Sequence, residues 1–142
     1  MSAQILYVED NPLNRTLIRK TLQMTEYRLI EAQTGAEGIE KAAHLHPDLI
    51  LLDFHLPDMK GVEVARFIRQ HPEIASTPII ALTADSSEDY YLNWEQIGLQ
   101  GYLVKPVHRQ TLLATIKTAL LSEPNHAHST AHLAHYTGAT LG

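Results

Sequence analysis

The feature that most constrains this chain is a run of four apolar residues at 49–52, which leads directly into Asp53. The run shows no alternation of apolar and polar residues, and its length suits a strand better than a helix. Such a strand is buried on both faces, which is typical of a parallel sheet covered by helices on each side. Because tight turns cannot join parallel strands, the chain must place a crossover, usually a helix, between one strand and the next.

The rest of the sequence alternates in the way that this fold requires. Short apolar segments predict strands, and these lie at 5–8, 27–30, 49–52, 79–82 and 101–104. A helical pattern follows each strand, and the fourth helix is expected at 87–97, closed by Gly98. The predicted fold class is therefore α/β and doubly wound, with a five-stranded parallel sheet and helices on both faces.

The first helix is expected to begin near Pro12, because proline suits the first helical position. Either Asp10 or Asn11 can cap this helix. Its apolar residues are expected on one face, and they are Leu13, Leu17, Ile18 and Leu22.

Composition excludes several classes of function. The formal net charge is −5 and no run of basic residues occurs, which argues against a nucleic-acid-binding surface. The absence of cysteine excludes disulfides and zinc-thiolate sites. No apolar stretch approaches the roughly 20 residues of a membrane span, and the first residues do not resemble a signal peptide. We therefore expect a cytoplasmic protein that binds neither nucleic acid nor membrane.

The composition changes after residue 122. Residues 123–142 hold four of the nine histidines and show no convincing apolar period. We expect residues 1–122 to form one domain and residues 123–142 to form a flexible tail or linker. A metal-binding role for the histidines of this tail is the less favoured alternative, because their spacing is uneven.

Polar residues follow four of the expected strands. Glu9 and Asp10 follow the first strand, and Asp53 follows the third. Thr83 follows the fourth strand and Lys105 the fifth. Sites in such sheets lie beyond the carboxyl ends of the strands, so these side chains should converge. Each has an ordinary explanation alone, as a cap, a turn residue or a solvated charge, but three carboxylates brought together repel one another unless a cation compensates.

Mg²⁺ is the cation that this group suits best. Carboxylate oxygens without histidine or cysteine partners favour Mg²⁺ over zinc, with Mn²⁺ as a substitute. Lys105 is a suitable partner for a phosphate group, and Thr83 can donate a hydrogen bond to a phosphoryl oxygen. Because a carboxylate can itself accept a phosphoryl group, the residues indicate phosphoryl chemistry on or near a carboxylate.

Four motifs carry a resemblance to a known family. They are YVEDN at 7–11, LILLDFHLPDMKG at 49–61, IIALTAD at 79–85 and GYLVKP at 101–106. In this order, each after its own strand, they resemble the receiver domain of bacterial two-component response regulators, the CheY-like superfamily, over residues 3–121. The resemblance implies a flavodoxin-like (βα)5 fold with strand order 2-1-3-4-5.

The resemblance also implies roles for individual residues. Asp53 would accept a phosphoryl group from a sensor histidine kinase, a histidine phosphotransfer protein or a small phosphodonor. Mg²⁺ would be held by Glu9, Asp10, Asp53 and the backbone carbonyl of His55. Lys105 would pair with the phosphoryl group.

The output of such a domain is a change of packing. By the resemblance, Thr83 and Tyr102 move together on phosphorylation, and Pro106 follows a cis peptide bond. The change is read by a downstream protein partner on the face formed by helix 87–97, strand 101–104 and the last helix. The same face could form a phosphorylation-dependent homodimer.

Some residues near the site are less typical of the family. His55 either tunes dephosphorylation or is an ordinary exposed loop histidine. Asp85 either orients a water or caps the next helix, and the small Ala84 should leave the phosphoryl site open. The expected helix 87–97 is rich in aromatic residues, which either pack in the core or include an exposed docking residue, with Tyr91 the candidate.

Three other functions compete with a phospho-accepting signalling module, which would not be an enzyme in the usual sense. A haloacid dehalogenase-type hydrolase would carry a second aspartate two residues after the nucleophile, where this chain has His55. A flavodoxin-like cofactor binder would need a phosphate-cradling loop at 9–12, which here is acidic. A receiver-like binding module that takes no phosphate is the third. The chain is either a stand-alone regulator or one receiver of a longer protein.

Overall fold

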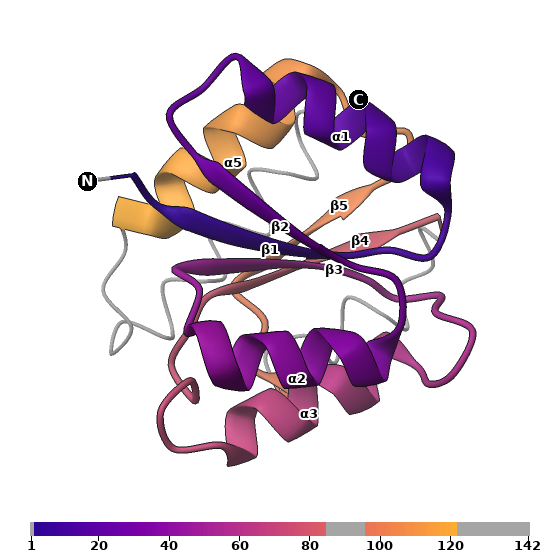
Figure 1. Cartoon of the computed structure of the whole chain (residues 1–142), viewed down its shortest axis with the longest axis vertical. Helices are drawn as coiled ribbons and strands as arrows, with labels where there is room; N and C mark the ends of the chain where they lie inside the picture. The colour runs from indigo at the N-terminus through magenta and orange to yellow at the C-terminus, as the bar shows by residue number, and fades with distance from the viewer. Residues whose placement is uncertain (1, 85–95, 122–142) are drawn as a thin grey trace.

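The computed structural model describes residues 2–84 and 96–121, and the structural statements below concern these residues. They form a sheet with helices on its two faces (Figure 1). The strands are β1 (Gln4–Val8), β2 (Arg28–Ala32), β3 (Leu49–Asp53), β4 (Ile79–Thr83) and β5 (Gly101–Val104). The helices are α1 (Pro12–Gln23), α2 (Gly35–Leu45), α3 (Gly61–Gln70) and α5 (Arg109–Leu121).

The sheet is parallel throughout, with the strand order β2-β1-β3-β4-β5. This confirms the predicted fold class and strand order. Register aligns the strand ends, because Val8 pairs with Leu52 and Leu52 with Ala81. The residues that follow β1, β3, β4 and β5 therefore emerge at one edge, which we call the carboxyl edge.

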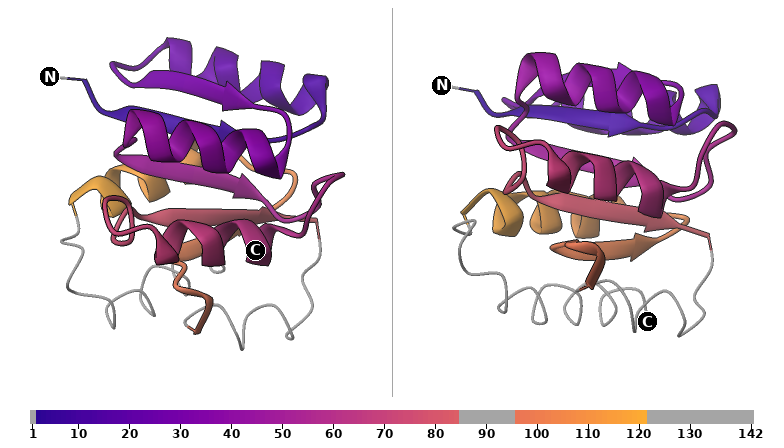
Figure 2. Two further views of the ribbon diagram at one scale, coloured as in Figure 1. Left: turned by 60° about the horizontal axis from the view of Figure 1, so that its bottom comes forward. Right: turned by 90° about the horizontal axis from the view of Figure 1, so that it is seen from below.

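Two apolar clusters fill the space between the sheet and its helices. The two turned views show the helices on either side of the sheet (Figure 2). Alternate residues of β1 point to opposite faces, so Leu6 and Val8 join α2 and α3 in one cluster. Ile5 and Tyr7 join α1 and α5 in the other. Every residue of β3 is buried, as its uninterrupted apolar run predicts.

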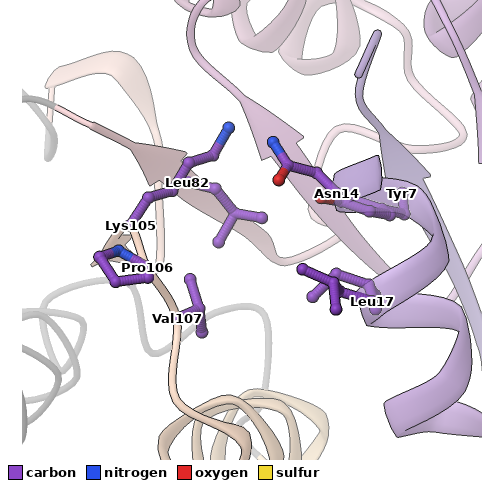
Figure 3. A pocket seen from close by; sticks show the side chains of 8 residues that line it. Tyr7, Asn14, Leu17, Leu82, Lys105, Pro106 and Val107 are labelled. Atoms are coloured by element: carbon purple, nitrogen blue, oxygen red, sulfur yellow. The ribbon is translucent and has the colours of Figure 1, made fainter. Parts of the chain in front are cut away.

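Helix α1 buries a narrower stripe than its sequence pattern predicts. Ile18 and Leu22 are buried, but Leu13 and Leu17 are 66% and 56% exposed. Of the four residues that the helical pattern groups, only Ile18 and Leu22 are buried. Leu17 instead lines one side of a pocket, and Val107 lines the other side (Figure 3). A residue's neighbours across such a gap cannot be read from helical periodicity, which fixes only which residues share a face.

Several expectations fall on parts of the chain that the structure does not describe. The expected helix 87–97 lies almost entirely outside the described residues, as do its aromatic residues, and so does the expected tail 123–142. Gly98, expected to close that helix, has a φ of +90°, which glycine adopts readily. Among the described helices, none has the length and apolar character needed to cross a membrane.

Candidate functional site

The carboxyl edge brings three of the predicted acidic residues together. Glu9, Asp10 and Asp53 each offer one oxygen, and these oxygens lie within 4.8 Å of one another. Glu9 and Asp53 are 1% and 2% exposed, whereas Asp10 is open to solvent. The group combines buried charge with one open side, which suits a hard cation that keeps some of its water.

Lys105 completes this cluster from the end of β5. Its Nζ lies 3.0 Å from Glu9 Oε1 and 3.1 Å from Asp53 Oδ2. Its backbone N–H donates to the carbonyl of Thr83 at 2.7 Å, which fixes the start of the loop, and the Lys105–Pro106 peptide bond is cis, as the resemblance implies. One ammonium group therefore neutralises part of the charge of two buried carboxylates.

The electrostatics of the two buried carboxyl groups differ. Burial is the main reason that the pKa of Asp53 is raised to about 6, and its hydrogen bond with Glu9 adds to this effect. Burial also acts to raise the pKa of Glu9, but hydrogen bonds with Asp53 and Lys105 outweigh it and hold that pKa below its usual value. Glu9 is therefore the more strongly stabilised anion, while ionised Asp53 is short of compensating charge.

The loop between β3 and α3 is tied down at two points. His55 is exposed, and its backbone N–H donates to Asp53 Oδ1 at 3.0 Å. Asp58 accepts from the backbone N–H groups of Gly35 and Ala36 at 2.8 and 2.9 Å, so it satisfies the first turn of α2 from another loop. The loop that carries the predicted carbonyl ligand is thus anchored to the neighbouring helix.

The loop between β1 and α1 is held by Asn11, one of the two predicted caps, and by Arg15, which the sequence analysis missed. Asn11, not Asp10, caps α1, because its side chain accepts from the N–H groups of Leu13 and Asn14. Arg15 Nη1 donates to the backbone carbonyls of Glu9 and Asp10 at 3.0 and 2.9 Å. With its carboxylate not needed for the cap, Asp10 stays available at the open side of the site.

Tyr7 is a second residue that the sequence analysis missed. Its hydroxyl donates to Glu9 Oε1 at 3.0 Å, and its ring is buried. Strand alternation was the available signal, because residues two apart on β1 share a face. Burial first, and then the charge of Glu9, raise the pKa of Tyr7 far above its usual value, so the hydroxyl keeps its proton.

The remaining predicted residues are placed as follows. Thr83 ends β4 and is 2% exposed, and Ala84 beyond it is exposed. Tyr102 on β5 is half-buried against the cluster under α2 and α3 and pairs in register with Ala81. Asp85 lies outside the described residues.

A pocket of about 120 Å³ opens beside Lys105 on the face covered by α1 and α5. Figure 3 shows Lys105, Pro106 and Val107 on one side of it and Asn14, Tyr7 and Leu17 on the other. Its walls are mostly apolar, and its polar groups come from residues that contact Glu9.

The sequence matches a family model described as the response regulator receiver domain over residues 5–117. The chain therefore belongs to that family. It is a receiver domain of the kind found in two-component response regulators, and the hydrolase and flavodoxin classes are not the family it matches.

Particular relatives narrow the comparison. The chain is 34% identical over 120 residues to a polar-differentiation response regulator, DivK, of Brucella ovis, covering 84% of this chain and 98% of that protein. Its fold matches the chemotaxis response regulator CheY4 of Vibrio cholerae with a TM-score of 0.79 and 32% identity, covering 84% and 99% of the two chains. The receiver domain of a sensor histidine kinase from Pseudomonas aeruginosa PAO1 matches with a TM-score of 0.79 and 34% identity, covering 86% of this chain and all of that one. That structure was described with a magnesium ion coordinated in its active site cleft.

Proposed function

We propose that this receiver domain accepts a phosphoryl group on Asp53 in a Mg²⁺-dependent reaction and passes the signal on by changing its packing. The observation that carries the proposal is the buried cluster in which Lys105 Nζ contacts both Asp53 and Glu9 while Asp10 completes a three-carboxylate group. A phosphoryl group on Asp53 would enter a site that already contains the ammonium group of Lys105. The three carboxylates of the same site could hold a metal ion as a second cation. The donor is a phosphohistidine of a sensor histidine kinase or a histidine phosphotransfer protein.

The phosphoryl transfer forms one bond to phosphorus and breaks another. An oxygen of ionised Asp53 attacks phosphorus, the bond between phosphorus and the donor nitrogen breaks, and the imidazole leaves with the electron pair of that bond. Lys105 then pairs with a phosphoryl oxygen, and Thr83 donates a hydrogen bond to another. These groups stabilise charge on the transferred group without themselves reacting.

The donor set fits Mg²⁺. Glu9, Asp10, Asp53 and the backbone carbonyl of His55 would hold it, and all of these donors are oxygens, as Mg²⁺ prefers. When bound, the ion neutralises charge on the phosphoryl oxygens. Mn²⁺ should replace it, since it takes the same oxygen ligands.

Signal output is proposed to begin at Thr83 and Tyr102. Both lie on neighbouring strands of the sheet, and movement of Thr83 toward a phosphoryl group would free space for Tyr102 to turn inward. The surface around β5 and α5 would then bind a downstream protein, or a second copy of the chain, in a cytoplasmic signalling pathway. The domain would act as a signalling module that only phosphorylates and slowly dephosphorylates itself.

The test is intact mass after incubation with acetyl phosphate, with and without Mg²⁺. We expect one added phosphoryl group in the wild type with Mg²⁺, and none in Asp53→Asn. Asp48→Asn is the matched control, because Asp48 is exposed and lies just before the opposite end of β3.

Two results would count against the proposal. Absence of both an adduct and binding of a beryllofluoride phosphoryl mimic would leave a phosphorylation-independent binding module. Continuous release of inorganic phosphate at an enzymatic rate would favour a hydrolase.

A further inference from the structure

Tyr7 places a single polar atom beneath the phosphoacceptor site. Tyr7 is 1% exposed, and its ring packs in the cluster under α1 and α5. Because Tyr7 and Glu9 lie two residues apart on one face, the hydroxyl reaches Glu9 Oε1 from below, at 3.0 Å. Core packing therefore fixes the position of this donor.

The two oxygens of Glu9 are held differently. Oε1 receives Tyr7 OH at 3.0 Å, Lys105 Nζ at 3.0 Å and, more distantly, Asn14 Nδ2 at 3.4 Å. Oε2 receives the backbone N–H of Asn11, at 3.2 Å, and the carboxyl group of Glu9 also shares a hydrogen bond with Asp53. A carboxylate oxygen accepts about two hydrogen bonds, so Oε1 is saturated and Oε2 keeps the capacity to bind a cation.

Of the donors on Oε1, Lys105 is the one that also serves the phosphoryl chemistry. Its Nζ already bridges Glu9 and Asp53, and pairing with a phosphoryl group would draw it away from Glu9. Asn14 is too distant to hold Oε1 alone. Tyr7 would then be the strong donor that remains, because its ring is packed in the core.

We propose that Tyr7 is a positioning residue of the receiver site, whose hydroxyl holds Glu9 Oε1 so that Oε2 faces the metal while Lys105 serves the phosphoryl group. The inference rests on the proposed function and adds a residue to it. Removing the hydroxyl should free Glu9 to rotate, which weakens metal binding without altering Asp53 or Lys105.

The experiment compares wild type, Tyr7→Phe and Tyr27→Phe. Mn²⁺ binding is measured from the EPR signal of the free ion in the presence of beryllofluoride, the phosphoryl mimic that would draw Lys105 away from Glu9, so the readout does not depend on phosphorylation. Tyr7→Phe should raise the Kd for Mn²⁺ by about tenfold, the scale typical of losing a group that orients a metal ligand. Tyr27→Phe should leave it unchanged, because Tyr27 packs on the same cluster just before β2, at the opposite end of the sheet.

Phosphorylation by acetyl phosphate supplies a second readout. In Tyr7→Phe the Mg²⁺ concentration for half-maximal rate should rise by a similar factor, while the rate at saturating Mg²⁺ stays within about twofold of wild type. In a Glu9→Ala background, Tyr7→Phe should change metal affinity no further, because the side chain that Tyr7 holds is then absent.

Each contrary result has a distinct meaning. Unchanged Mn²⁺ affinity in Tyr7→Phe overturns the inference. So does an equal loss of affinity in the Glu9→Ala background, which would mean that Tyr7 acts through packing. If the wild type neither binds Mn²⁺ nor takes a phosphoryl group, the proposed function fails first.

Discussion

A partly buried basic residue lies at each edge of the sheet, Arg69 at one and Lys105 at the other, but their partners differ. At the edge where β4 and β5 begin, Arg69 donates to the carbonyls of Gly98, Ala75 and Thr77 and to the side-chain oxygen of Gln100. All of these partners are neutral, and burial lowers the pKa of Arg69 to about 10. At the carboxyl edge, Lys105 faces two buried carboxylates and a third exposed one.

The difference separates a structural charge from a functional one. Arg69 uses its planar fork of donors to join the end of α3, the start of β4 and the residues before β5, and its hydrogen bonds are satisfied. The carboxyl edge instead holds more negative charge than Lys105 can neutralise. That edge is expected to gain stability when a cation binds or a carboxylate is neutralised, whereas the Arg69 edge is expected only to lose stability when altered.

Arg69→Met should have the largest effect on folding. The substitution keeps an apolar stem but leaves several partly buried carbonyl oxygens without donors, each costing up to about 1–3 kcal/mol. We expect the free energy of unfolding to fall by about 3 kcal/mol in urea denaturation. Arg66→Met, an exposed site on the same helix, is the control, and an equal loss there would remove the distinction between the two edges.

Asp53→Asn should raise the free energy of unfolding, whereas Arg69→Met lowers it. Since the pKa of Asp53 is raised from 3.8 to about 6, the folded state binds this proton more tightly than the unfolded state. Ionised Asp53 therefore destabilises the fold at high pH, and the cost vanishes as pH falls toward 4. We expect Asp53→Asn to be more stable than wild type by about 2 kcal/mol at pH 8 without metal, and equally stable near pH 4.

Mg²⁺ should stabilise the wild type more than Asp53→Asn. It should raise the melting temperature of the wild type at pH 8 by the larger amount, because only the wild type has the full set of carboxylates. A variant that is no more stable than wild type at pH 8 would show that Lys105 already compensates the charge of Asp53.

Asp58→Ala should have the smallest effect of the three. Asp58 accepts two backbone hydrogen bonds at the start of α2, and losing such a cap costs about 1 kcal/mol. Hydrogen bonds from the N–H groups of Ala36 and Gly35 outweigh burial and lower the pKa of Asp58, so its contribution is present at neutral pH and lost as pH falls through that lowered value. The loss should appear as a lower melting temperature for Asp58→Ala than for the control Glu40→Ala, an exposed site, in thermal unfolding at pH 7. Equal melting temperatures would mean that the loop is held by other contacts.

Local patterns were enough to predict the sheet and the acidic group. An apolar run that ends in Asp53 is a buried strand whatever surrounds it, and parallel strands bring their ends to one edge. The strand order was instead implied by the resemblance to receiver domains that the four motifs carry. These predictions hold because strand periodicity and topology are properties of the chain itself.

Contacts between different helices and strands could not be predicted from the sequence. Periodicity grouped Leu13 and Leu17 with Ile18, but it could not show that a pocket lies beside Leu17. Strand alternation could place Tyr7 and Glu9 on one face, but it could not show that Tyr7 and Arg15 both donate hydrogen bonds to Glu9.

The sequence by itself determined which residues reach the carboxyl edge, because each strand delivers the residue that follows it. How those residues share charge and hydrogen bonds depends on the packing of distant segments against one another. The reason is physical: a side chain's face follows from local geometry, whereas the pKa of Asp53 and the orientation of Glu9 depend on donors and burial supplied by segments far apart in the chain.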